Sequence, residues 1–203
     1  MTRERPDQPT ILRFWKPCGV LSQFRDADGR PTIKDFVDVA SDVYPVGRLD
    51  KDSEGLLLLT NDPRLTKHLL EPKFGHPRTY LVQVEHIPGE EALQKLRKGV
   101  SIKTGRTKPA EVRLLEDEPD LPPRDPPIRY RENVPTAWLE MTLTEGKNRQ
   151  VRRMTAAVQH PTLRLVRAAI GPITTDGLLP GEAQNLTDTE QSALYKMLKL
   201  ENK

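Results

Sequence analysis

The order of apolar and polar positions along the chain predicts short strands alternating with short helices. Residues 55–60, GLLLLT, form a continuous apolar run next to charged residues, which is typical of a strand buried on both faces. Residues 78–85 and 137–143 alternate apolar and polar positions, as a strand with one buried face does. Tyr80 and Val82 share the apolar face of the first alternating segment. The pattern therefore predicts that the Tyr80 side chain points inward.

Two helices are predicted from their end signals. Asp62 can cap a helix through Leu70, and Pro63 suits its first turn. Thr187 and Glu190 have the spacing of a capping box, in which each side chain bonds the backbone of the other end of the first turn. This box predicts a final helix that extends to residue 200.

Two more helices are predicted from apolar spacing. Residues 89–98 form an amphipathic pattern that ends at Gly99. Residues 148–158 form another, with Asn148 as its cap and an apolar stripe of Val151, Met154, Thr155 and Val158. The arginines of this second segment lie off the stripe, so we expect them on its solvent side.

The remaining patterns complete an α+β fold with a mixed, mostly antiparallel sheet flanked by helices. A proline-rich, charged segment, residues 116–134, is predicted to be a surface loop. We expect a flexible tail at residues 1–9 and one domain at residues 10–200. Further strands are predicted at residues 10–15, 43–46, 100–103, 110–115, 163–170 and 181–186, with a short helix at residues 32–37.

Composition excludes several classes of protein. The 203 residues include one cysteine, Cys18, so no disulfide can form within the chain. The four histidines have no ligand-like spacing, and we expect no metal. The N-terminus is charged and has no apolar segment behind it, so a secretory signal, a membrane anchor and a membrane location are not expected. We therefore expect a cytoplasmic protein. We also expect it to act as a monomer.

The distribution of charge is more informative than the net charge of +3. Residues 147–169 contain six cations and no acid. Five of the six are arginines, whose planar guanidinium suits phosphate. A one-signed segment in a chain of otherwise mixed charge indicates a polyanionic partner. The cations are Lys147, Arg149, Arg152, Arg153, Arg164 and Arg167.

A charged turn lies between the predicted strands at residues 43–46 and 55–60. It contains Arg48 and Asp50, and two explanations of this pair are open. One is a polar site mounted on two buried strands, and the other is a solvated turn with an ion pair. An RNA-modifying site would combine a catalytic Asp50 with a stacking Tyr80 and arginines for flanking phosphates.

Three motifs in order resemble those of the pseudouridine synthases, and the match extends from residue 11 to about residue 186. Gly47-Arg48-Leu49-Asp50, followed by LLLLTND, resembles the catalytic motif of that family. RTYLV at residues 78–82 resembles its strand motif, although the first residue there is usually lysine. EGKNRQVRRM at residues 145–154 resembles its third motif. The ribosomal RNA-specific RsuA/RluE branch is the most similar.

The resemblance implies an isomerase that needs no cofactor and converts a specific uridine of ribosomal RNA to pseudouridine. It favours ribosomal RNA of the large subunit as the substrate. It implies the family fold, with two subdomains that share the sheet and an active-site cleft between them. Asp50 would be the nucleophile, and whether it attacks the sugar or the base, or removes a sugar proton, stays open. Arg152 would pair with it and keep it ionised.

The resemblance also implies supporting roles. Tyr80 would stack on the flipped uracil, Val151 would form an apolar wall, and Arg48 would help to flip the base or fill its gap. The RNA would be bound by Lys147, Arg149, Arg153, Arg164 and Arg167.

Two alternatives and one departure accompany this hypothesis. The chain could be a non-catalytic RNA-binding or ribosome-assembly factor. A glycoside hydrolase using Asp50, Asp52 or Glu54 would need two carboxylates across a sugar and would not explain the basic segment. Many relatives begin with an S4-type RNA-binding domain, which we do not expect here because only about ten residues precede the first strand.

Overall fold

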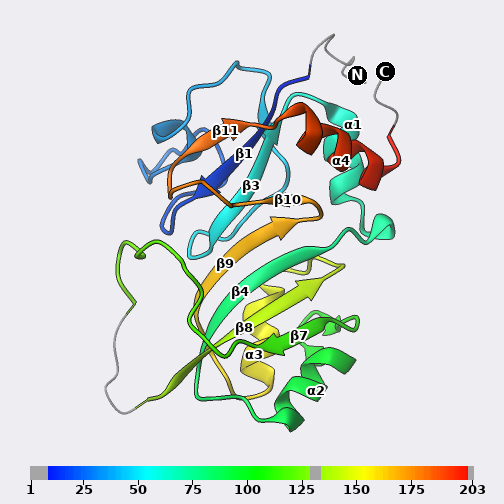
Figure 1. Cartoon of the computed structure of the whole chain (residues 1–203). Helices are drawn as coiled ribbons and strands as arrows, with labels where there is room; N and C mark the ends of the chain where they lie inside the picture. The colour runs from blue at the N-terminus through cyan, green and yellow to red at the C-terminus, as the bar shows by residue number, and fades with distance from the viewer. Residues whose placement is uncertain (1–8, 129–133, 201–203) are drawn as a thin grey trace. The chain divides into compact units, whose positions relative to one another are not determined.

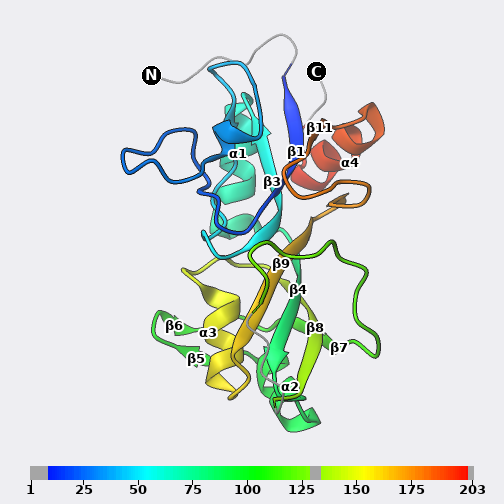
Figure 2. The same cartoon turned by 90° about the vertical axis from the view of Figure 1, so that its left-hand side faces the viewer.

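The computed structural model describes residues 9–128 and 134–200. It divides into two compact units, of which the first contains Met1–Phe74 and Ala169–Lys203 and the second contains Gly75–Ala168. Figures 1 and 2 show the elements of both units. Residues 1–8 of the predicted tail lie outside the described residues, as do residues 129–133 of the predicted loop.

The sheet of the first unit has the order β11-β1-β3. Strand β1 (Ile11–Lys16) pairs antiparallel with β3 (Glu54–Thr60), from Ile11 opposite Thr60 to Lys16 opposite Gly55. Its other edge pairs with β11 (Ala183–Asn185). Two short strands complete the unit: β2 (Tyr44–Pro45) pairs with β3, and β10 (Ile173–Thr174) pairs with the end of β9 (Thr162–Ile170).

All seven residues of β3 are buried, which confirms the prediction of a strand covered on both faces. Leu56 and Leu58 pack in one cluster with helices α1 (Pro63–Leu70) and α4 (Asp188–Leu198), which Figure 1 shows side by side. Leu57 and Leu59 point to the other face, where they pack with Phe14 and with the 3₁₀ helix η1 (Ile33–Asp35). A second 3₁₀ helix, η2 (Pro72–Phe74), follows α1.

The second unit has its own core and the strand order β9-β4-β8-β7. Strand β4 (Arg78–Glu85) pairs antiparallel with β8 (Thr136–Leu143) along its whole length, and β8 pairs antiparallel with β7 (Glu111–Leu114). Helices α2 (Glu90–Lys98) and α3 (Gln150–Ala157) contribute Leu93, Leu96, Val151 and Met154 to the core. The α+β class and the mainly antiparallel sheet are thus confirmed.

One predicted strand is much shorter in the structure. The strand expected at residues 100–103 is reduced to β5 (Ser101–Ile102), which pairs only with β6 (Gly105–Arg106) in a separate hairpin. Gly99 has φ +81°, and a side chain there would collide with the Thr107 carbonyl, so the chain turns sharply after α2. The described part of the predicted loop, residues 116–128 and 134, contains no helix or strand. No helix in the part of the chain that the structure describes is long and apolar enough to cross a membrane.

Candidate active site

The loop that contains Asp50 connects β2 to β3 and is fixed by buried hydrogen bonds. The Ser22 hydroxyl donates to the Leu49 carbonyl over 2.8 Å and accepts from the Leu49 amide over 3.0 Å. The Ser53 amide donates to the Asp50 carbonyl over 3.0 Å. Leu49 and Ser53 are buried, whereas Asp50 is half-buried. The backbone on both sides of Asp50 is therefore fixed by hydrogen bonds.

Gly47 allows the bend that precedes Arg48. Its φ is +74°, and an added Cβ would lie 2.8 Å from Cδ2 of Leu70. A residue with a side chain would be strained here by its backbone and crowded by α1. The Arg48 side chain that follows is exposed. The geometry of this turn thus presents Arg48 to solvent.

Lys16, at the end of β1, is a buried charge beside this loop that the sequence analysis missed. Its side chain is 0% exposed, and its ammonium donates to the carbonyls of Pro17 and Val20 over 2.8 Å each. Burial lowers the pKa of Lys16 from 10.5 to about 8, although Cys18, Glu54, Asp52 and Asp50 act in the opposite direction. Lys16 thus adds positive charge behind the Asp50 loop. Its position after an apolar run and before Pro17 was the only local signal.

Two other acids of this region, Glu54 and Asp62, are buried within the fold. Glu54 starts β3 and is 2% exposed. Asp62 caps α1 as predicted, since it accepts from the Arg64 amide over 2.9 Å, and it also accepts from the Tyr195 hydroxyl over 3.1 Å. Burial raises the pKa of Asp62, but the hydrogen bonds from Arg64 and Tyr195 outweigh it and the pKa is lowered. Asp62 therefore joins α1 to α4 within the first unit.

Tyr80 lies on β4 opposite Met141 and packs against the core of the second unit, so its predicted inward face is confirmed. It remains half-buried. The guanidinium of Arg167 on β9 makes a hydrogen bond with the Tyr80 side chain. Burial lowers the pKa of Arg167 below its ordinary value, and the nearby Arg78 acts in the same direction. The contact with Tyr80 acts in the opposite direction but does not outweigh burial. Tyr80 therefore has an apolar support and a cationic neighbour.

Helix α3 begins one residue later than predicted, because its N-cap is Arg149 rather than Asn148. Arg149 has φ +50° and makes no capping hydrogen bond through its side chain. The Asn148 side chain is used differently, since its oxygen accepts from Nη2 of Arg153 over 2.8 Å. The rule that asparagine caps helices failed here because this asparagine bonds a side chain in the first turn.

The loop before α3 is braced by Gln150. Its side-chain oxygen accepts from the Lys147 amide over 2.9 Å, and its side-chain nitrogen donates to Glu145 over 2.7 Å. Val151 is 5% exposed and belongs to the core of the second unit, Arg152 is half-buried, and Arg149 is exposed. The apolar stripe of α3 is as predicted, and the arginines lie off it.

Arg164 and Arg167 were predicted to bind RNA, and the structure places both inside the second unit. They are 7% and 5% exposed. Nη2 of Arg164 donates to the Pro122 carbonyl over 2.8 Å, which ties the proline-rich loop to β9. Their positions make these two side chains much less accessible than Arg149.

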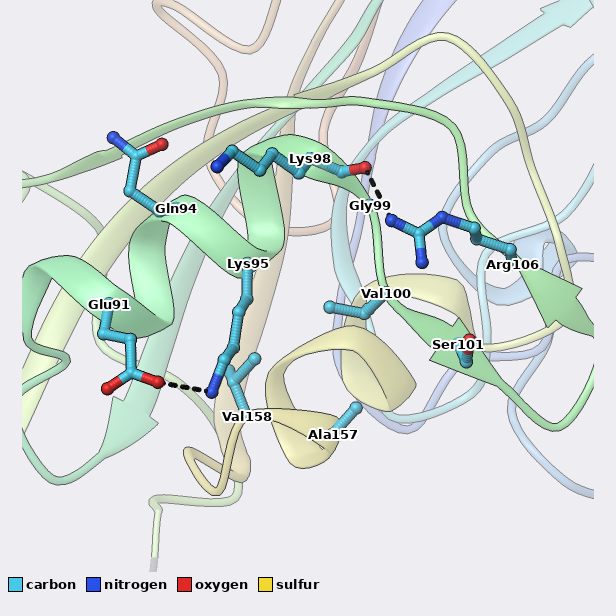
Figure 3. Close-up of a pocket in the computed structure, with 10 residues that line it drawn as sticks. All are labelled: Glu91, Gln94, Lys95, Lys98, Gly99, Val100, Ser101, Arg106, Ala157 and Val158. Carbon is cyan, nitrogen blue, oxygen red and sulfur yellow. Dashed lines mark hydrogen bonds and ion pairs between the residues drawn. The ribbon is translucent and has the colours of Figure 1, made fainter.

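The second unit also contains a basic cavity of about 560 Å³ that the sequence analysis did not single out (Figure 3). It is lined by α2, by the β5–β6 hairpin and by the end of α3. Lys95 forms an ion pair with Glu91 over 2.7 Å, and Arg106 donates to the Lys98 carbonyl over 3.4 Å. Part of the charge around this cavity is therefore used within the unit.

Comparison with known proteins defines the class of this chain. Residues 11–157 match the family model described as RNA pseudouridylate synthase. This chain therefore belongs to the RNA pseudouridylate synthase family, and it is an isomerase that converts uridine to pseudouridine. The resemblance noted from the three motifs is confirmed.

Two individual relatives are similar to this chain over most of its length. The chain is 54% identical over 172 residues to a protein of Vibrio parahaemolyticus named Ribosomal large subunit pseudouridine synthase E, covering 85% of this chain and 71% of that one. It is 57% identical over 167 residues to a protein of the same name from Xanthomonas axonopodis pv. citri, covering 81% and 87%.

A solved structure confirms the fold. A crystal structure of a pseudouridylate synthase superimposes with a TM-score of 0.76 at 29% identity, covering 92% of this chain and 74% of that chain. A structure of an H/ACA RNP bound to a substrate RNA superimposes with a TM-score of 0.57 at 16% identity, which indicates a shared fold only.

Proposed function

We propose that this chain modifies a specific uridine in ribosomal RNA of the large subunit. The observation that supports this substrate most directly is the identity of 51% to 57% to four relatives that are all named Ribosomal large subunit pseudouridine synthase E. An enzyme of this kind works in the cytoplasm, where ribosomal RNA is made in bacteria. The proposal needs no second copy of the chain, because one chain contains all the residues assigned below.

Asp50 is the proposed nucleophile. The reaction breaks the bond between the sugar and N1 of uracil, rotates the base and forms a bond from the same sugar to C5. C5 then loses its proton, and N1 gains one. Substrate and product contain the same atoms, so no co-substrate is consumed. The fixed backbone on both sides of Asp50 supports this role, because a nucleophile must be aimed before it reacts.

The remaining site residues are assigned by the three motifs. The target base must leave its stack, and Tyr80 is proposed to stack against it beside the apolar Val151. Arg152 is proposed as the cation that keeps the Asp50 carboxylate charged. Arg48, which is exposed, is proposed to fill the gap that the flipped base leaves. Lys147, Arg149 and Arg153 are proposed to bind phosphates.

Arg164 and Arg167 take a narrower part in this proposal. Because both are buried, we propose that they support the RNA-binding surface from inside and reach RNA only through the residues that they contact. For Arg164 this residue is Pro122, and for Arg167 it is Tyr80.

The test is pseudouridine mapping of ribosomal RNA from cells that lack this protein. Wild type should restore one lost pseudouridine, and Asp50→Asn should restore none, because an amide cannot act as the nucleophile. We expect a loss of at least about 1000-fold in rate, the scale on which removing a catalytic group acts.

Asp52→Asn is the matched control, since it removes an acid of the same loop that has no proposed contact with substrate. It should restore the site within a few-fold of wild type. If Asp50→Asn restores the pseudouridine, the catalytic assignment is wrong and a non-catalytic role is favoured. If no pseudouridine depends on the protein in any ribosomal RNA, the proposed substrate is wrong.

A further inference from the structure

The first unit contains a cavity of about 700 Å³ that the site assigned above does not use. Its walls are the segment between β1 and β2 and the start of β2 itself. The volume lies in the range of pockets that enclose small organic ligands. The residues that matter most for its chemistry are Ser22, Phe24, Arg25, Lys34, Val39 and Tyr44.

The lining of this cavity suits a nucleotide. Phe24 and Val39 are half-buried and pack against the core, which gives the cavity an apolar floor. The Tyr44 side chain is 43% exposed and provides an aromatic face at the cavity. Unstacked bases of RNA bind to protein by stacking on such rings.

The charge of the lining is also complementary to RNA. Arg25 and Lys34 are exposed, and Asp38 is the one acid that lines the cavity in the part of the chain that the structure describes. Two acids near Arg25 pair with Arg30, since Asp26 bonds it through both of its oxygens and Asp28 forms an ion pair with it. A phosphate could therefore approach the cavity without meeting a cluster of carboxylates.

The wall around Arg25 is pre-organised. The Gln23 side chain donates to the Arg25 carbonyl over 2.7 Å, and the Ile33 amide donates to the Gln23 carbonyl over 3.0 Å. The Arg30 amide donates to Asp26 over 2.9 Å, which closes the turn. Binding to a fixed wall costs less conformational entropy than binding to a loop that must first become ordered.

The cavity is joined directly to the Asp50 loop. Ser22 lines the cavity and also makes both hydrogen bonds to Leu49, the residue before Asp50. Val43, another lining residue, packs in the same core cluster as Leu49. Ser22 therefore connects one wall of the cavity to the Asp50 loop, whereas Tyr44 pairs with Thr60 at the opposite end of β3.

We propose that this cavity binds one unstacked nucleotide of the RNA strand that contains the target uridine, with its base against Tyr44 and its phosphate near Arg25 and Lys34. The inference rests on the proposed function and extends it. A second extruded base in a fixed place would orient the strand on the Asp50 loop. It would also restrict the enzyme to sites where a neighbouring base can leave the stack.

The test compares Tyr44→Leu with wild type in steady-state pseudouridine formation on an unmodified transcript of large-subunit ribosomal RNA. Tyr44→Leu should raise KM about 10-fold or more and change kcat little, since base stacking contributes to binding. Tyr44→Phe keeps the ring and should recover most of the lost affinity. The melting temperature of each variant shows that the fold is intact.

Phe74→Leu is the matched control, because it removes another exposed ring of the same unit outside this cavity and should leave KM unchanged. Arg25→Ala together with Lys34→Ala should lower the slope of log Kd against log salt by about 1, as expected when phosphate contacts are lost. An unchanged slope would overturn the placement of the phosphate.

A second arm identifies the nucleotide. Each of a set of short RNAs centred on the modified uridine carries one abasic position. One of these RNAs should bind wild type more weakly than the intact RNA does, whereas Tyr44→Leu should bind that RNA and the intact RNA equally. Such coupling shows that ring and base interact. If every abasic effect is the same in both proteins, or if Tyr44→Leu leaves KM unchanged, the inference is wrong. Wild type that forms no pseudouridine at all would instead refute the proposed function.

Discussion

α3 and β9 follow one another in the basic segment at residues 147–169, and they use their arginines in opposite ways. Arg149 at the start of α3 is exposed, whereas Arg164 and Arg167 on β9 are 7% and 5% exposed. A helix that packs through one stripe leaves the other side in solvent. A strand covered on both faces does not, and residues 164 and 167, three apart, point to opposite faces of β9. Arginines of the same basic segment therefore occupy two different environments, one exposed and one buried.

The largest expected effect is a loss of stability when the buried Arg167 is replaced. Arg167→Glu should lower the free energy of unfolding by about 3 to 5 kcal/mol, because it buries a carboxylate beside Tyr80 in place of a bonded cation. Arg149→Glu should change it by less than about 0.5 kcal/mol, as surface substitutions do. Urea denaturation measures both.

Arg167→Met is the control for packing. It removes the charge but keeps an unbranched side chain of similar length, so it should cost much less than Arg167→Glu. Equal losses for Arg149→Glu and Arg167→Glu would mean that the contrast between α3 and β9 is not energetic.

Lys16 extends the comparison to a buried cation in the first unit. Its lowered pKa means that the unfolded chain binds more protons than the folded chain between about pH 8 and pH 10.5. The contribution of Lys16 to stability should therefore rise with pH across this window, by roughly 3 kcal/mol in total. Below about pH 8 both states are protonated, and the contribution is constant.

The measurement is the difference in unfolding free energy between wild type and Lys16→Met at several pH values. Wild type should gain on the variant as the pH rises from about 8 toward 10.5. A difference that is independent of pH in this window would show that Lys16 is not desolvated in the folded protein.

The smallest effect concerns the exposed side of the comparison and is seen in binding. Arg149→Gly with Arg153→Gln should raise the Kd for large-subunit ribosomal RNA about 10-fold at 0.1 M salt and reduce the salt slope by about 1 to 2. Glycine at position 149 also tolerates φ +50°, so little stability should be lost. Filter binding at several salt concentrations measures both quantities.

Arg113→Gln is the matched control, since Arg113 is an exposed arginine of the same unit that pairs with Glu140 over 2.8 Å. It should leave the salt slope unchanged. A slope that is the same in the α3 variant and wild type would place the RNA elsewhere on the chain.

Local rules predicted much of the fold. Helix α1 and strand β4 have the predicted bounds, and the capping box at Thr187 is present. Each depends on residues within about four positions of one another, so short stretches contain the necessary information. The same rules failed at Asn148, where a competing side-chain bond to Arg153 decided where α3 begins.

The candidate site was likewise predictable only in part. Sequence placed Asp50 in a turn between two strands and Tyr80 on an inward face, and the structure has both. It could not reveal Lys16 as a buried cation, because that requires knowing which chain segments cover the end of β1. It could not reveal the cavity beside Tyr44 either, since residues 22 to 45 form it only after they fold back on each other.

The family, the order of the elements and the three motifs could be predicted from the order of residues alone, because periodicity and motif spacing are properties of neighbouring residues. The tertiary structure decided which charges are buried. Tyr195 bonds Asp62 across 133 positions, and Arg164 bonds the Pro122 carbonyl across 42. Burial and long-range hydrogen bonds depend on which distant segments meet, and that sets the environment of every charge in this molecule.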